Sequence, residues 1–195
     1  MPEKPAIPDI HPLSKRRWSD FTRLFGAKGA CGGCWCMWWR LSAKEFEDRK
    51  GEKNRRAMKR IVDAGRVPGL LAYLDGEPVG WVSVAPREEF PRLERSRILA
   101  PVDEKPVWSV VCLFVAREHR RRGIAVRLLE GAVDHVRENG GRIVEGYAVE
   151  PEEGKRVPDA FAYHGPAAAY RAAGFREVAR RSPTRPIMRR VVRGR

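Results

Sequence analysis

Three consecutive arginines, Arg120, Arg121 and Arg122, stand directly before Gly123, and they follow the apolar run 107–115. An amphipathic segment comes after them, so the order predicts a strand, a basic loop and a helix. Backbone N–H groups at a helix N-terminus lack intrahelical partners and carry partial positive charge. Because Gly123 has no Cβ, the main chain can approach a ligand closely. The ligand expected here is a phosphate or a pyrophosphate.

The spacing of this loop differs from two common phosphate-binding loops. It is neither the G-x-G-x-x-G of dinucleotide folds nor the G-x-x-x-x-G-K-[ST] of nucleoside-triphosphate loops. The pattern Arg120-x-x-Gly123-x-Ala125 after an apolar strand resembles the acyl-CoA pyrophosphate loop of the GNAT superfamily of N-acyltransferases. The alternative interpretation of the pattern alone is a basic helix start on a solvated surface.

A second motif supports the resemblance. The helix that begins at Ile124 is expected to end at 139–141, which reads Asn-Gly-Gly, and a short strand pattern covers 142–150. Further on, Tyr170-Arg-Ala-Ala-Gly174-Phe175 matches the Y-x-x-x-G-F ending of the last helix in the GNAT pattern. The two motifs follow the family's order, and the resemblance covers about residues 69–192.

The length of 195 residues fits one domain, which is large enough to bury a core without metals or disulfides. Residues 1–13 are rich in proline and expected to be loose, and residues 14–195 are expected to form a single GNAT-like domain. The predicted fold class is α/β, with a mixed, mostly antiparallel central sheet flanked by helices. Helices are expected at 18–25, from Ser42 to about 64, from 124 and from 166 to 174, and strands at 34–40, 70–74, 79–85, 107–115, 142–150, 175–180 and 187–192.

The resemblance assigns the cofactor contacts. It implies acetyl-CoA as co-substrate, with no metal. Free backbone groups of the strand before the loop would pair with the pantetheine arm, and the basic loop and its helix start would hold the pyrophosphate. The strand positions are Leu113, Phe114 and Val115, and the loop positions are Arg120, Arg121, Arg122, Gly123, Ile124, Ala125 and Val126.

Acylation of an amine needs a thioester held in place, a neutral amine and a proton for the leaving thiolate. Tyr170 matches the family's thiolate-protonating tyrosine, and a phenol with a pKa of about 10 is a proton donor at neutral pH. The alternative role for Tyr170 is packing on a short helix.

The general base has several candidates. Glu145 lies in the middle of the strand expected at 142–150, where some family members place a carboxylate that faces the acceptor. Burial would raise its pKa toward neutrality, whereas an outward-facing glutamate would have no such role. His164 is a second titratable group near the Tyr170 helix, and water alone serves some relatives. The family often has asparagine near the point where this chain has Tyr163 and His164.

Cys31, Cys34 and Cys36 cluster in one short segment. One C-x-x-C pair is half of a zinc site, and the other half is missing, with Cys112 alone in its strand. These thiols are therefore expected to serve as small apolar side chains in a half-buried strand. The alternative is a zinc-dependent binding domain.

The net charge of +14 and the pI of about 10.3 favour anionic partners such as CoA phosphates, nucleic acid or an acidic surface. No RNA-recognition, zinc-finger or helix-turn-helix signature is present, which disfavours nucleic acid. No secretory signal is evident, and no apolar run reaches the roughly 18 residues that span a bilayer. We therefore expect a cytoplasmic protein with reduced cysteines and no membrane partner.

The sequence thus predicts an acyltransferase that moves an acetyl group from acetyl-CoA to a primary amine by direct attack on the thioester. The alternative is a basic, non-catalytic GNAT-like module that binds nucleic acid or another anion. The acceptor is a small-molecule or protein amine, and the protein is a monomer or homodimer. The basic loop 87–97 favours an acceptor with a carboxylate or phosphate, provided that this loop reaches the cleft.

Overall fold

The computed structural model describes residues 7–152, 154 and 163–192. Within them a seven-stranded sheet has the order β1-β2-β3-β4-β5-β7-β6. Only β4 and β5 pair in parallel, and the other neighbours are antiparallel. This confirms the mixed, mostly antiparallel sheet. The strands are β1 (Asp9–Pro12), β2 (Gly69–Leu74), β3 (Glu77–Pro86), β4 (Trp108–Val115), β5 (Ile143–Tyr147), β6 (Arg176–Arg180) and β7 (Pro186–Val191).

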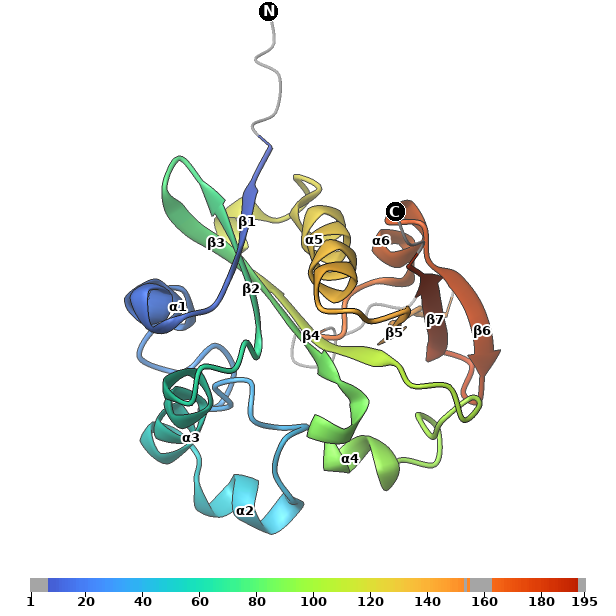
Figure 1. Cartoon of the computed structure of the whole chain (residues 1–195), viewed down its shortest axis with the longest axis horizontal. Coiled ribbons are helices and arrows are strands. Elements are labelled where there is room, and N and C mark those ends of the chain that lie inside the picture. The colour runs from blue at the N-terminus through green and yellow to red at the C-terminus, as the bar shows by residue number, and fades with distance from the viewer. Residues whose placement is uncertain (1–6, 153, 155–162, 193–195) are drawn as a thin grey trace, which may run out of the picture.

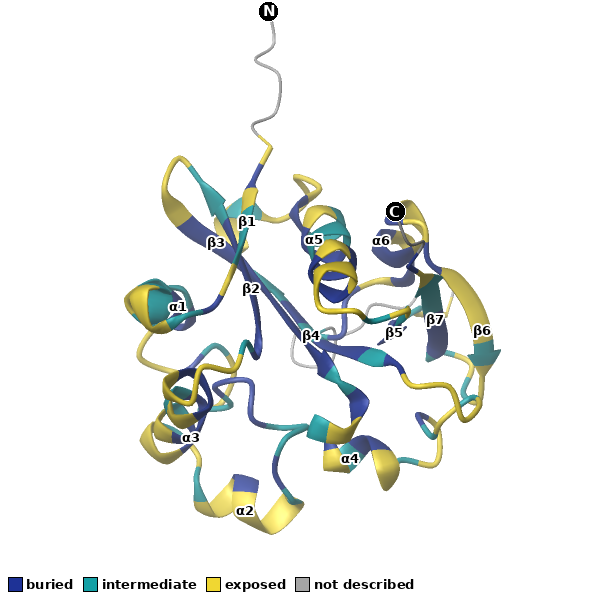
Figure 2. Cartoon of the chain, in the orientation of Figure 1, coloured by how far each residue is buried: buried dark blue, intermediate teal, exposed yellow. Residues whose placement is uncertain are grey.

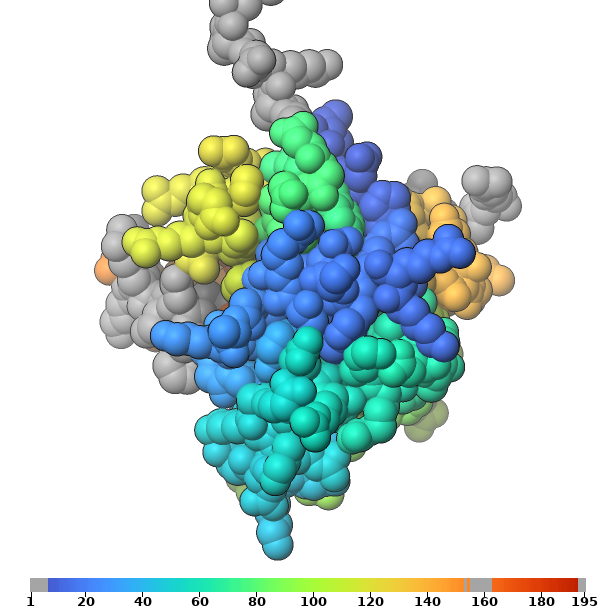
Figure 3. All heavy atoms as spheres, turned by 90° about the vertical axis from the view of Figure 1, so that its left-hand side faces the viewer, coloured from blue at the N-terminus to red at the C-terminus, as the bar shows by residue number. Residues whose placement is uncertain are grey.

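Helices cover both faces of the sheet (Figure 1). The N-terminal helices and α4 lie on one face, and α5 and α6 lie on the other; Figure 3 shows the N-terminal part of the chain, blue to teal, spread over the first face. The helices are α1 (Trp18–Phe25), α2 (Ala43–Asp48), α3 (Glu52–Asp63), α4 (Pro91–Glu94), α5 (Ile124–Glu138) and α6 (Ala167–Ala172), with 3₁₀ turns at η1 (Lys15–Arg17), η2 (Arg87–Glu89) and η3 (Arg117–His119).

The apolar stripe of α5 is buried against the sheet, as its periodicity predicts. The buried side chains of this helix are Ile124, Leu128, Leu129, Ala132, Val133, His135 and Val136. The apolar ones among them join one core with residues of β2 to β5 and of α6. A second core, on the other face, packs α1, α3 and the turns before α2 on Trp81 of β3. Figure 2 shows the buried sides of the helices facing the sheet.

The segment expected as a strand at 34–40 is instead a series of turns, which corrects the sequence prediction. Its backbone bonds are local, with the Met37 amide donating to Cys34 and the Arg40 amide to Met37. Trp35 and Cys36 have φ of 46° and 59°, a left-handed conformation that no extended strand contains. The alternation of apolar residues here reflects packing in the core of α1 and α3, not pairing in the sheet.

Part of the N-terminal segment expected to be loose is also a strand. Residues 9–12 pair with β2, and Ile10 fits against Gly131 of α5, where an added Cβ would lie 2.6 Å from Ile10 Cγ2. Pairing with β2 and packing of Ile10 against Gly131 of α5 therefore order residues 9–12, although the prolines of this segment predicted a loose chain. No helix among the residues that the structure describes is long and apolar enough to cross a membrane.

Candidate active site

The two parallel strands, β4 and β5, separate in the middle of the sheet. Their register extends from Trp108 opposite Val144 to Val110 opposite Gly146. Beyond that point the Leu113 amide donates to the Tyr163 carbonyl, 2.6 Å away. The chain just before α6 therefore lies beside the second half of β4, at the split between the strands.

The predicted pantetheine-binding positions differ in the direction of their backbone groups. The Ala116 amide donates to Val79 of β3, and alternate residues of an antiparallel ladder point toward the partner strand. Phe114 therefore directs its backbone to β3, which argues against its predicted contact with the cofactor. Leu113 and Val115 point to the split, where the Leu113 amide already has a partner and the Val115 carbonyl accepts from Arg120 Nε at 3.2 Å.

The basic loop before α5 forms a row of backbone donors. Arg121 and Gly123 have φ of 64° and 77°, so alternate residues of the loop are left-handed, the geometry of an anion-binding nest. Within the described part of the chain, the amides of residues 121–125 have no acceptor. The Val126 amide donates to Gly123 of its own helix, so this position drops out of the predicted phosphate site. A Cβ on Gly123 would meet open space, which leaves room for a ligand.

Tyr170 of α6 is fully buried at the split. Its hydroxyl donates to the His164 carbonyl at 2.9 Å. Gly146 of β5 makes room for the ring, because a Cβ there would lie 2.2 Å from Tyr170 Cε1. Burial, and then the nearby Cys112, raise the pKa of Tyr170 above its usual value, so the phenol keeps its proton at neutral pH.

Glu145 is also fully buried, but it lies on the opposite face of β5, because successive strand residues alternate and Gly146 faces Tyr170. Its carboxylate accepts from Arg87 Nη1 at 3.2 Å, Arg189 Nε at 2.7 Å and the Tyr147 hydroxyl at 2.8 Å. The structure thus does not bring the two predicted catalytic residues together. Both carboxylate oxygens of Glu145 are already engaged by protein donors, on the face of β5 away from Tyr170.

The network around Glu145 was not predicted from the sequence. Arg87 Nη1 also donates to the Tyr147 hydroxyl at 2.6 Å, and Ser109 Oγ lies 2.8 Å from the same oxygen. Arg87 is 8% exposed, although it sits in a charged loop that suggested a solvated side chain. Burial raises the pKa of Tyr147, as does the Glu145 charge. Side chains two residues apart in a strand point to the same face, so the spacing of Glu145 and Tyr147 was the local signal that they lie together.

His164 lies beside Tyr170 in sequence and in space, but it does not suit the role of a base. Burial, and then the charge of Arg185, lower its pKa to about 3. The imidazole therefore stays neutral across the physiological range.

The cysteines are free, and three of them belong to the core of α1 and α3. Trp81 Nε1 donates to Cys36 Sγ at 3.2 Å. A hydrogen bond from Cys112 is the main cause that lowers the pKa of Cys36 to about 7, and burial opposes it. Among the described residues, no group of three cysteine, histidine or acidic side chains is arranged to hold a metal ion.

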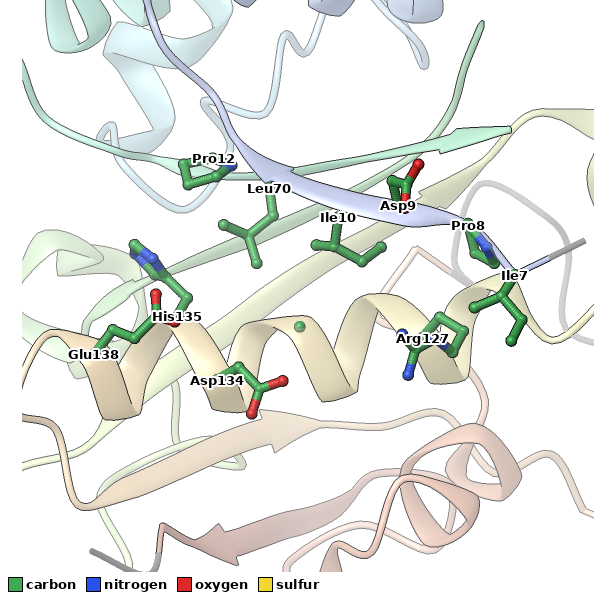
Figure 4. Close-up of a pocket in the computed structure, with 11 residues that line it drawn as sticks. Ile7, Pro8, Asp9, Ile10, Pro12, Leu70, Arg127, Asp134, His135 and Glu138 are labelled. Carbon is green, nitrogen blue, oxygen red and sulfur yellow. The ribbon is translucent and has the colours of Figure 1, made fainter. Parts of the chain in front are cut away.

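Two cavities of the described part of the molecule bear on the site. One, of about 660 Å³, is lined by charged side chains of the loop 87–107 together with Glu145 and Arg189. The other, of about 330 Å³, lies between β1 and α5, where Figure 4 shows Ile10 and Leu70 facing the helix and Asp134 and His135 along it. It contains none of the predicted site residues.

The split sheet, the amide-rich loop and the buried tyrosine make up the candidate site, and comparison with protein families assigns the chain to a family. The model of the Acetyltransferase (GNAT) family matches residues 35–156. The chain belongs to this family. A comparison with curated proteins finds no match.

Solved structures share the fold at low sequence identity. A GNAT-family acetyltransferase from Listeria monocytogenes has a TM-score of 0.56 and 8% identity, with 94% of each chain covered. The PaiA N-acetyltransferase from Thermoplasma acidophilum, solved in complex with coenzyme A, has a TM-score of 0.52 and 14% identity, with 95% of this chain and 99% of that chain covered. A GNAT-family acetyltransferase from Streptococcus pneumoniae has a TM-score of 0.52 and 12% identity, with 95% and 99% covered. The GNAT fold of this chain is thereby confirmed.

Proposed function

We propose that this chain is an N-acetyltransferase that takes the acetyl group from acetyl-CoA and transfers it to a primary amine by direct attack on the thioester. The observation that carries the proposal is the row of amides at residues 121–125, which have no acceptor among the described residues and lie in the loop that follows β4. The family membership and the coenzyme A bound to the PaiA neighbour support it.

In this proposal the pyrophosphate of acetyl-CoA binds the loop amides, and the exposed side chains of Arg121 and Arg122 add charge. The pantetheine arm enters the split beside Leu113 and Val115. The amine attacks the thioester carbonyl, a C–N bond forms, and the C–S bond breaks. Tyr170 donates its hydroxyl proton to the departing thiolate, and water rather than Glu145 takes the proton of the amine.

Four free cysteines fit a reducing compartment, so we also propose that the protein acts in the cytoplasm. Acetyl-CoA would be supplied there.

The test of cofactor binding is Gly123→Glu. A carboxylate at this position would enter the space left for the phosphates and repel them, so we expect acetyl-CoA binding to be lost in calorimetry. Gly140→Glu is the matched control, since Gly140 has φ of 76° at the other end of α5 and also faces open space. Both variants carry the same backbone strain. Equal affinity of the folded Gly123→Glu protein and the control would refute the proposed loop site.

A further inference from the structure

Six buried side-chain nitrogen or oxygen atoms have no hydrogen-bond partner among the described residues. Three of them, Trp39 Nε1, Arg92 Nη2 and His164 Nδ1, belong to residues that are neighbours in the fold. The rings of Trp39 and His164 lie 5.4 Å apart, and the Arg92 amide donates to the Trp39 carbonyl at 3.5 Å. An unsatisfied buried polar group costs about 1–3 kcal/mol. Trp39 Nε1 and Arg92 Nη2 are donors, and His164 Nδ1 donates or accepts according to the tautomer, so an external polar group would satisfy all three atoms.

These groups lie directly beside the proposed reaction centre. The His164 carbonyl accepts the hydroxyl of Tyr170, and the carbonyl of the preceding Tyr163 accepts the Leu113 amide at the split. Trp39 therefore contacts the same residue, His164, that binds the proposed proton donor. A molecule that meets the three nitrogen atoms would have its own reactive group close to the thioester.

The cluster carries positive charge, and the Glu47 carboxylate, whose charge acts to raise the pKa of Arg92, forms its ion pair with Lys50 instead. Burial raises the pKa of Tyr163 to about 12, and the charges of Arg185 and Arg92 oppose this rise, which places both guanidinium groups near the ring. No carboxylate in the described part of the chain forms an ion pair with either arginine. Arg87 and Arg189, by contrast, are both paired with Glu145.

The Arg92 side chain is held in a fixed place. Its guanidinium carbon lies 3.6 Å from the centre of the Trp38 ring, and Nε donates to the Leu41 carbonyl at 2.9 Å. The remaining Nη2 is the atom without a partner. A preorganised guanidinium loses little entropy when it binds an anion, and it matches the planar geometry of a carboxylate.

We infer that the acceptor amine carries a carboxylate, as an amino acid does, and that Arg92 and Trp39 bind it. This inference rests on the proposed acetyl transfer. The indole and guanidinium N–H groups can only donate, and a carboxylate can only accept. A single negative charge beside Arg92 is also easier to bury than the double charge of a phosphate. The product is the N-acetyl amino acid and free CoA thiol, because the amine loses one proton and the thiolate gains one.

The inference is tested by thiol release from acetyl-CoA with the twenty proteinogenic amino acids, each paired with its α-carboxamide, and with phosphoethanolamine. We expect at least one amino acid to show a kcat/KM that exceeds that of its amide by tenfold or more. Equal or better turnover of the amides, a preference for phosphoethanolamine, or no turnover of any amino acid would overturn the inference. Failure of the acetyltransferase proposal itself would show separately, as no binding of acetyl-CoA in calorimetry.

The variant Arg92→Gln locates the effect. We expect KM for the preferred amino acid to rise about 10- to 100-fold and its advantage over the amide to disappear, with little change in kcat or in acetyl-CoA affinity. Arg95→Gln is the matched control, because Arg95 ends the same short helix and is exposed. Trp39→Phe keeps an aromatic ring but removes the indole N–H, so it repeats the test should Arg92→Gln fail to fold. An unchanged amino acid preference in both folded variants would contradict the assignment.

Discussion

The Glu145 side chain lies on one face of β5, and the Tyr170 ring packs on the other face, at Gly146. The two side chains therefore have different surroundings and different chemical roles. Tyr170 occupies the space that Gly146 leaves open, beside the split where a thioester sulfur would lie. Glu145 is enclosed by Arg87, Arg189 and Tyr147. A glutamate in the middle of β5 would face the acceptor if it lay on the same face of the strand as Tyr170. The role of Glu145 therefore depends on the face of β5 to which its side chain points.

Removal of the Tyr170 hydroxyl tests the proton-donor role. We expect Tyr170→Phe to lower kcat by roughly 10²–10⁴, the usual range for a positioned general acid, with little change in KM for acetyl-CoA. Tyr73→Phe is the control. Tyr73 lies on β2, away from the split, and its hydroxyl donates to Asp20 Oδ2 at 2.8 Å. A near-normal kcat of the folded Tyr170→Phe protein would show that the ring only packs and that solvent protonates the thiolate.

Neutralisation of Glu145 tests its structural role. In Glu145→Gln the guanidinium groups of Arg87 and Arg189 lose the charge that they share, and breaking a buried ion pair typically costs about 3–5 kcal/mol. We expect the free energy of unfolding in urea to fall by about 3 kcal/mol. Glu130→Gln, which breaks the partly exposed pair with Arg127, should cost about 1 kcal/mol or less. A stable Glu145→Gln protein that has lost kcat alone would instead support Glu145 as the base.

At the scale of elements, the sequence predicts best where a local pattern and its tertiary use agree. Ser42 and Glu45 form the reciprocal capping box of α2, and Asp75-Gly76 forms the hairpin turn between β2 and β3. The stripe on α5 faces the sheet, and the helix ends at Glu138, just before the expected signal. In each case the information lies within a few residues.

The elements that were predicted wrongly depend on distant partners. The segment 34–40 has the apolar alternation of a strand, yet it fills a core between two helices as turns. The direction of the Phe114 backbone is fixed by β3, and the burial of Arg87 by Glu145. No local spacing encodes such long-range contacts.

The turn segment also decides the role of the cysteines. Cys34 and Cys36 pack in the core with Cys112, and Trp81 donates to Cys36 Sγ, so these thiols are used inside the fold. We expect elemental analysis of mildly purified protein to find well under one zinc per chain, because one C-x-x-C pair supplies too few ligands. One equivalent of zinc that disappears in the Cys31→Ser, Cys34→Ser double variant would contradict this expectation.

At the scale of the whole molecule, basic residues have two distinct uses. Some neutralise buried or surface carboxylates, as Arg189 does for Glu145 and Asp103. Others are exposed, as Arg121 and Arg122 are in the loop before α5. In the proposed function these two exposed arginines use part of the net charge of +14 to attract the cofactor phosphates.

The buried imidazole of His164 makes the stability of the whole fold depend on pH. Its native pKa of about 3 lies below the ordinary value of about 6.5, so between these values the unfolded chain binds a proton that the native protein does not. The contribution of His164 to the free energy of unfolding is therefore fully present above pH 6.5 and decreases as the pH falls below that value. Between pH 7 and 5.5 the loss from His164 is about 1 kcal/mol. His135, whose pKa burial also lowers, adds a loss in the same direction.

Urea unfolding at pH 7 and at pH 5.5 measures this loss. The interval lies above the titration of Glu150, whose pKa Arg171 and Arg180 lower to about 2, so carboxylates contribute little to the difference. We expect His164→Gln to remove about 1 kcal/mol of the pH-dependent loss, whatever its own effect at pH 7, because glutamine does not titrate. If His164→Gln and the parent protein lost equal stability over this interval, the imidazole would not be buried in its neutral form, and its place beside Tyr170 and Trp39 would have to be different.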